Sequence, residues 1–74
     1  MFMKTVYPKG ISESGISFAD LLIGHCIERA SNLVDAIKDA DKMFQMSGLA
    51  QYTVSIHELS NGMPEIRVTD RIKH

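Results

Sequence analysis

The side chains best suited to chemistry in this sequence are those of one cysteine and three histidines: Cys26, His25, His57 and His74. Thiolate and imidazole groups are the ligands that zinc prefers, and structural zinc sites normally use four of them. No two of these residues have CxxC or HxxxH spacing. His25 and Cys26 are adjacent, so on a helix they point about 100° apart. The sequence therefore predicts no metal site, and no cofactor is expected.

A nucleophilic pair of Cys26 and His57 is the one catalytic arrangement that the sequence suggests. Cys26 lies within a stripe of apolar residues, and burial there would raise the pKa of its thiol and suppress the reactive thiolate. No third group is evident that would orient the imidazole. We therefore expect no enzymatic activity.

Residues 10–17 have the glycine spacing of a phosphate-binding loop, with Gly10 and Gly15 in the required places. The lysine that contacts the terminal phosphates in such loops is replaced by Ile16. Glu13 adds a negative charge that would repel a phosphate. Nucleotide binding is not expected, and this segment is interpreted as a loop that leads into a helix.

The 74 residues form a single domain, 1–74, with 45% hydrophobic and 23% charged residues and a net charge of −1. This balance gives no general attraction to nucleic acid or to an anionic membrane. A domain of this size buries only about 60% of the surface that its unfolded chain exposes. A protein partner or a homodimer is therefore expected.

The single cysteine excludes an intrachain disulfide and favours a reducing compartment. No apolar run reaches the roughly 18 residues of a membrane span. The first residues lack the basic and then apolar layout of a signal peptide. A cytoplasmic protein without membrane contact is therefore expected.

The dominant pattern is a predicted helix over residues 18–46, capped by Ser17 with Asp20 three residues later. Its apolar stripe recurs every three or four residues. The stripe contains Leu22, Ile23, Cys26, Ile27, Ala30, Leu33, Val34, Ile37, Ala40, Met43 and Phe44. Gly48 and Leu49 are typical of a helix end. The pair at 31–32 is a weak point, but the stripe keeps its phase there and favours one continuous helix.

Strands are predicted over residues 2–7, 52–59 and 65–72, the last two as a hairpin around Asn61-Gly62. A three-residue loop, 60–62, places Ile56 opposite Ile66 and keeps the apolar side chains on one face. The fold class is therefore α+β, with a β-α-β-β order. One long amphipathic helix would pack on a three-stranded antiparallel sheet.

A helix of that length would span roughly 43 Å at about 1.5 Å per residue, far more than its sheet. The uncovered part of its stripe would require another surface. We expect a protein interface on this helix. Its predicted residues are Leu22, Ile23, Cys26, Ile37, Met43 and Phe44, with Asp35 and Asp39 from the polar face. Gly24, inside the helix, suggests a close approach by a neighbouring element.

Two alternatives remain open. Arg67, Arg71 and Lys73 would make the outer face of the sheet locally basic, as in a small nucleic-acid-binding regulator. The aromatic platform of a single-strand binder is missing from that face. The second alternative is an oligomer that holds a small molecule between subunits, although no pocket can be located from the sequence.

The favoured hypothesis is a small non-catalytic protein–protein interaction module. A short chain without a catalytic motif is typical of inhibitors and adaptors encoded by mobile elements. Phage-encoded anti-CRISPR proteins, which act on a larger host complex, have this general character. The sequence itself does not identify the partner.

Overall fold

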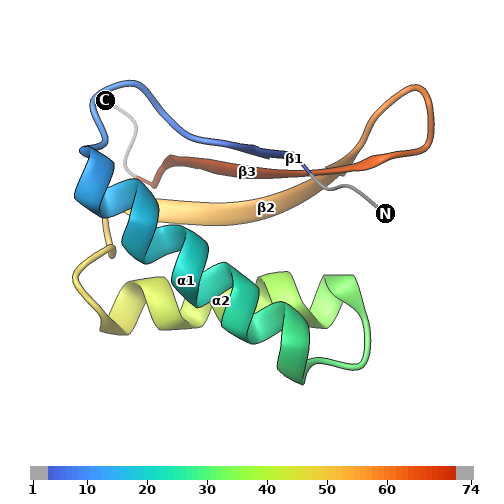
Figure 1. Cartoon of the computed structure of the whole chain (residues 1–74), viewed down its shortest axis with the longest axis horizontal. Helices are drawn as coiled ribbons and strands as arrows, with labels where there is room; N and C mark the ends of the chain where they lie inside the picture. Colours follow the sequence, from blue (N-terminus) through green and yellow to red (C-terminus); the bar gives the residue numbers. More distant parts are fainter. Residues whose placement is uncertain (1–3, 72–74) are drawn as a thin grey trace.

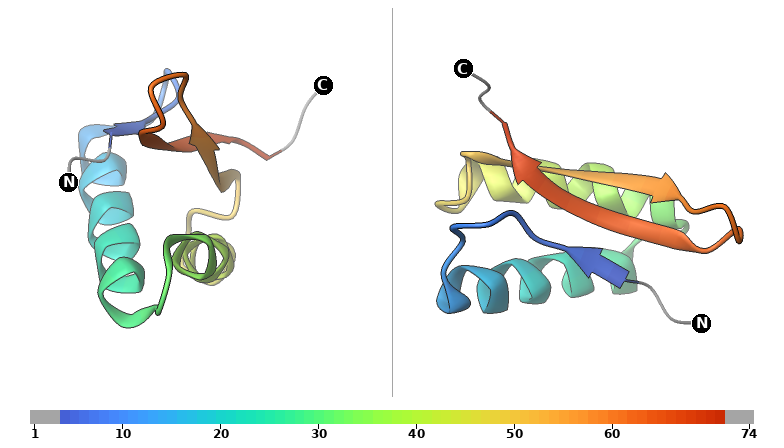
Figure 2. Two further views of the ribbon diagram at one scale, coloured as in Figure 1. Left: turned by 90° about the vertical axis from the view of Figure 1, so that its right-hand side faces the viewer. Right: turned by 90° about the horizontal axis from the view of Figure 1, so that it is seen from above.

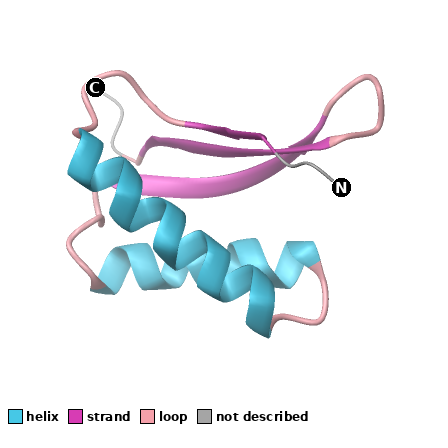
Figure 3. Cartoon of the chain, in the orientation of Figure 1, coloured by secondary structure: helices cyan, strands magenta, loops and turns pink. Residues whose placement is uncertain are grey.

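The computed structural model describes residues 4–71 and has two layers, with a three-stranded sheet and two helices on one of its faces (Figures 1 and 3). The elements are, in order, β1 (Lys4–Val6), α1 (Glu13–Arg29), α2 (Leu33–Met46), β2 (Tyr52–Glu58) and β3 (Pro64–Asp70). The α+β class is confirmed. The predicted first strand is shorter than expected within the described residues, and its first two positions lie outside them.

The prediction of one long helix is wrong, because the chain breaks between Arg29 and Leu33. Asn32 has an extended backbone, and its side-chain oxygen accepts a hydrogen bond from the Asp35 N–H at 2.9 Å. Asparagine is among the best residues for capping a helix start in this way. The unbroken phase of the apolar stripe does not distinguish one helix from two. Each of two helices can bury its own portion of the stripe against the same sheet.

The first helix begins at Glu13, five residues before the predicted start. Ser12, and not Ser17, caps it: the Ser12 hydroxyl oxygen accepts a hydrogen bond from the Gly15 N–H at 3.0 Å. The serines and glycine of this segment have weak helix propensity, which is why it was interpreted as a loop. The cap and the following apolar turn outweigh that propensity.

The predicted end of the helical region is confirmed. Gly48 has a positive φ of 86°, a conformation that glycine adopts without steric cost. The Leu49 N–H donates to the Phe44 carbonyl at 3.2 Å, and the Leu49 side chain is buried. This arrangement is the Schellman motif, which pairs carbonyls that a helix end leaves free.

The sheet is mixed and not antiparallel, so this part of the prediction is wrong. The strand order is β1-β3-β2, with β1 parallel to β3 and β2 antiparallel to β3. The second helix explains the difference, because each of the four connections between consecutive elements reverses the chain. In a β-α-α-β-β chain, β1 and β3 therefore run in the same direction. With a single helix, the two strands would run in opposite directions.

The hairpin register is confirmed, with Ile56 opposite Ile66 and Val54 opposite Val68. The loop contains three residues, and Gly62 has a φ of 81°. The Gly62 N–H donates to the Leu59 carbonyl at 2.8 Å. This is the type I turn followed by a left-handed glycine that such loops commonly form.

The core lies between the sheet and the two helices, where Phe44, Ile66 and Val68 are the largest fully buried side chains. Figure 2 shows α1 beneath the β1 side of the sheet and α2 beneath the β2 side. The molecule measures only 30 × 26 × 22 Å. The chain therefore covers most of its own apolar stripe, and the argument from an overhanging helix no longer holds.

Gly24 has no close neighbour, contrary to the sequence-based expectation. A Cβ atom built at this exposed position would meet no atom within 4 Å. Gly24→Ala is expected to stabilise the protein by about 0.5–1 kcal/mol, because alanine restricts the unfolded chain and favours the helix. The midpoint of urea unfolding measures this effect.

Gly15→Ala is the matched control within the same helix. Its new Cβ would lie 3.0 Å from the Ile11 Cγ1 atom and 3.2 Å from the Ser12 hydroxyl oxygen, so crowding should offset the gain. A midpoint for Gly24→Ala at or below that of the wild type would contradict the prediction.

Candidate protein-binding groove

A groove of about 310 Å³ lies between α1 and α2 and is open to solvent. We call it the interhelical groove. Its lining comes from both helices: His25, Cys26, Arg29, Asp39, Lys42, Met43 and Met46. On α1, Arg29 follows Cys26 by three positions and His25 by four. On α2, Met43 follows Asp39 by four positions, and Met46 follows Met43 by three. Residues three or four positions apart are neighbours on one side of a helix.

Sulfur-containing side chains form the apolar part of the groove. The Cys26 thiol lies 3.3 Å from the Met43 sulfur and is almost fully buried. Met46, one turn further along α2, is 80% exposed. Methionine is flexible and polarisable and is used repeatedly at surfaces that accept varied apolar partners. The groove therefore offers an adaptable apolar surface.

Charged side chains surround this apolar floor. Arg29, Lys42 and His25 contribute basic groups, and Asp39 contributes one carboxylate. The formal charges of Arg29, Lys42 and Asp39 sum to one net positive charge. The sequence-predicted Asp39 therefore lies within a lining that is more basic than acidic.

The chemistry of the Cys26 thiol does not suit a nucleophile. Burial is the main cause that raises the pKa of this thiol, the Asp39 carboxylate raises it further, and Arg29 partly opposes them. The thiol is therefore protonated at neutral pH and poorly reactive. Residues 4–71 contain no group of three or more His, Cys, Asp or Glu side chains placed to hold a metal ion.

Cys26 and His57 are not brought together. Cys26 packs between the helices, whereas His57 is exposed on β2, with its Nε2 atom 3.1 Å from the Ser55 hydroxyl. The Cys–His pair suggested by the sequence is therefore not formed.

Most of the predicted interface residues pack inside the chain itself. Five of the eight are buried in the core: Leu22, Ile23, Cys26, Ile37 and Phe44. Asp35 is at the start of α2, where its carboxylate accepts a hydrogen bond from the Asn32 side chain at 3.0 Å. Cys26, Met43 and Asp39 are the three that the structure brings together, in the interhelical groove.

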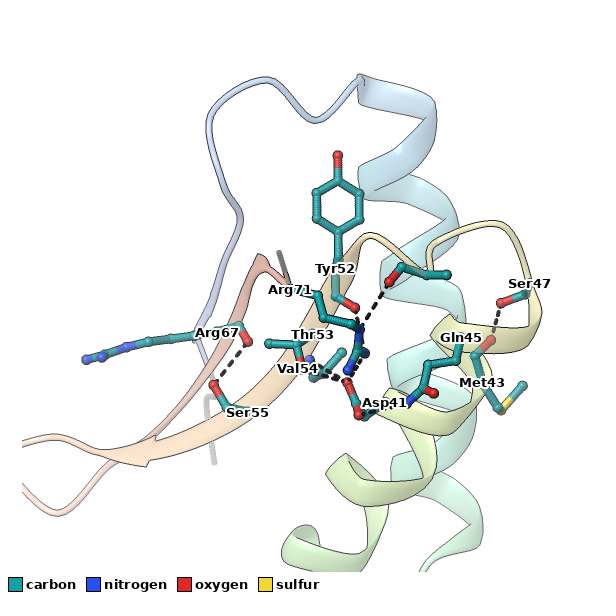
Figure 4. A network of polar contacts seen from close by, with 11 residues as sticks. Asp41, Met43, Gln45, Ser47, Tyr52, Thr53, Val54, Ser55, Arg67 and Arg71 are labelled. Atoms are coloured by element: carbon teal, nitrogen blue, oxygen red, sulfur yellow. Dashed lines mark hydrogen bonds and ion pairs between the residues drawn. The ribbon is translucent and has the colours of Figure 1, made fainter. Parts of the chain in front are cut away.

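The basic residues of the nucleic-acid alternative are separated from one another. Arg67 forms an ion pair with Glu65 at 2.6 Å, on the side of the sheet away from the helices. Arg71 forms an ion pair with Asp41 of α2 at 2.9 Å (Figure 4). Lys73 lies outside the described residues. Both described arginines thus have their charge compensated by a carboxylate.

Asp41 is the centre of a polar cluster that joins α2 to β2 and to the residue after β3. Its Oδ1 atom accepts hydrogen bonds from the Thr53 hydroxyl at 2.9 Å and from the Val54 N–H at 3.0 Å. The Arg71 guanidinium donates to the same atom and to the Tyr52 carbonyl, each at 2.9 Å (Figure 4). The sequence did not reveal this cluster, because its members are far apart in the chain.

The groove residues that sequence reasoning missed are His25, Arg29, Lys42 and Met46. None of the four belongs to the apolar stripe of the single predicted helix. The signal that could have found them is the pair Met43 and Met46, three residues apart at a helix end. The two methionines indicate a groove only when the helix is known to break at 30–32, because that break places α2 beside α1.

No family model matches the chain, and no curated protein or solved structure is similar enough to it to indicate a relative. Within residues 4–71, neither helix is long and apolar enough to cross a membrane. The functional argument therefore depends on the geometry of the surface.

Proposed function

We propose that this chain is a non-catalytic protein-interaction module that holds an apolar segment of a partner protein in the interhelical groove. The observation that carries the proposal is Met46, which stands 80% exposed at a groove lined by Cys26 and Met43. The exposed Met46 side chain, beside the half-buried Met43 and charged groups of both helices, offers an apolar contact for a partner.

The geometry of two packed helices suits a helical segment of the partner. Amphipathic helices commonly bind by placing an apolar face in such a groove. Arg29 and Lys42 at the groove favour acidic residues beside the partner's apolar face, because complementary charges fix the orientation of the complex. The proposed ligand is therefore an acidic amphipathic helix.

An inhibitor or adaptor of a larger complex is the role that we propose within this class. Such a role requires only that the chain occupy a surface of its partner, and the buried, protonated Cys26 is poorly suited to nucleophilic catalysis. The nucleic-acid alternative has less support, because Arg67 and Arg71 are engaged by carboxylates.

The test is affinity capture from host lysate with the wild type and two single variants, followed by mass spectrometry. Met46→Glu places a negative charge at the groove and is expected to reduce recovery of the specific partner by about ten-fold or more. Leu21→Glu is the matched control, since Leu21 is a 69% exposed apolar residue of α1 that does not line the groove.

A partner recovered equally by the wild type and Met46→Glu would contradict the proposal. So would capture of this same chain alone, since the groove would then serve a homodimer. Light scattering of each variant checks that the substitutions leave size and folding unchanged.

A further inference from the structure

The outer edge of β2 presents backbone groups in a known direction. In the order β1-β3-β2, this strand has a neighbour on one side only among the described residues. Successive residues of a paired strand direct their N–H and C=O groups alternately toward the partner strand and away from it. The Arg71 N–H donates to the Gln51 carbonyl, so odd-numbered residues face β3. Even-numbered residues of β2 therefore face outward.

The first half of this edge is closed by the chain itself. The Tyr52 N–H donates to the Leu49 carbonyl at 3.0 Å, and the Tyr52 carbonyl accepts from Arg71. The Val54 N–H donates to Asp41. These contacts occupy the positions that an added strand would need.

The second half of the edge is open. The outward N–H and C=O groups of Ile56 and Glu58 have no protein partner among residues 4–71. An extended segment laid beside them could exchange up to two hydrogen bonds with each residue, as in an antiparallel pair. Strand addition at an exposed sheet edge is a common mode of peptide binding.

An apolar hollow lies beside this open edge. It has a volume of about 480 Å³ between α2 and β2, and its apolar side chains come from Val34, Ile37, Val54 and Ile56. A second hollow of about 230 Å³ continues past Glu58 and shares Val34 and Ile56 with the first. Val34 is 53% exposed, so a side chain from an added strand could contact it.

The charges at the hollow favour an acidic ligand. Lys38, Lys42 and Asp41 are its charged lining residues. The Asp41 carboxylate is already paired with Arg71, so two lysine charges remain uncompensated by that carboxylate. A segment with a carboxylate close to its apolar residue would complement them.

We propose that the β2 edge at Ile56 and Glu58 binds an extended segment of another protein by strand addition. One apolar side chain of that segment enters the hollow against Val34, and a carboxylate faces Lys38 and Lys42. This site shares Lys42 with the interhelical groove, but Val34, Ile56 and Glu58 take no part in that groove, so the proposal is tested independently of the function proposed above.

The experiment measures backbone amide hydrogen exchange by NMR in the full chain, with and without a hexapeptide probe. The probe has two glutamates followed by alternating valine and threonine. We expect exchange at Ile56 and Glu58 to slow by about ten-fold or more at saturating probe, because new hydrogen bonds protect these amides. The Ser55 and His57 amides, which face β3, should change little.

Val34→Lys should abolish this protection by filling the hollow with charge, whereas Leu21→Lys, the same change at an exposed site of α1, should not. A probe with lysines in place of the glutamates should bind more weakly.

Unchanged exchange at Ile56 and Glu58 would overturn the proposal. Protection that rises with protein concentration alone would also overturn it, because the occupant would be a second copy. Met46→Glu should leave the result unchanged.

Discussion

Phe44→Ala is expected to lower the free energy of unfolding by about 3–5 kcal/mol, the range for removing a buried phenylalanine side chain. Phe44 is 0% exposed and is the largest of the fully buried side chains at the centre of the core. Its main chain also closes the end of α2, where its carbonyl accepts from Leu49.

The expected loss for Phe44→Ala is a large part of the total free energy of unfolding. A domain of this length has a total stability of roughly 4–11 kcal/mol. Urea unfolding followed by circular dichroism measures the difference between variant and wild type. Phe18→Ala is the control, because Phe18 is 40% exposed on α1 and should cost less than half as much. Equal losses for the two variants would show that the core is not centred on Phe44.

Asp41→Ala is expected to cost about 1.5–3 kcal/mol, the range for hydrogen bonds to a charged group. The substitution removes the acceptor shared by Thr53, Val54 and Arg71, and it leaves the Val54 N–H without its partner. It also removes the polar contacts that join α2 to β2. Asp39→Ala, two residues away on the exposed side of α2, should change stability by less than about 0.5 kcal/mol.

The pH dependence of stability provides a second measurement on Asp41. Burial raises the pKa of this carboxyl, but the hydrogen bonds from Val54, Thr53 and Arg71 together outweigh it, so the pKa lies below its ordinary value. A carboxyl with a lowered folded pKa contributes stability above its unfolded pKa of about 3.9 and loses it as pH falls through the folded pKa.

The difference in unfolding free energy between the wild type and Asp41→Ala should therefore be constant from pH 7 to pH 5. It should shrink below about pH 4. Urea unfolding at pH 7, 5 and 3 gives this difference directly. A difference that is as large at pH 3 as at pH 7 would mean that the charge of Asp41 is not involved.

Local signals in the sequence predicted the hairpin well. The alternation of 52–59 and 65–72 allowed only one register that kept Ile56 and Ile66 on the same face, and that register is observed. The glycines at 48 and 62 likewise carried enough information to place a helix end and a turn. Such features depend on neighbours in the chain, which a single sequence contains.

The helix break and the sheet direction could not be predicted in the same way. Whether Asn32 continues a helix or caps a new one depends on whether folding back buries more apolar surface, which is a property of the whole molecule. The apolar period is the same in both cases. Once that choice was wrong, the direction of β1 relative to β3 was wrong as well.

The candidate groove was predicted only in part, for the same reason. Cys26 and Met43 were selected as members of an apolar stripe, without knowledge that they face each other. Met46, His25 and Lys42 acquire a role only from the antiparallel placement of the two helices. Exposure, which distinguishes Met46 from the buried Phe44, is decided by tertiary packing.

The position of β3 at the centre of the sheet has a consequence for how the chain folds. Both edge strands pair with β3 and not with each other, yet β3 comes last of the five elements. No strand pairing can form until that segment takes its place, and the β1–β3 ladder then joins residues about sixty positions apart. Such long-range closure slows folding. The β2–β3 hairpin joins neighbouring segments, so β1 should be the last strand to join the sheet.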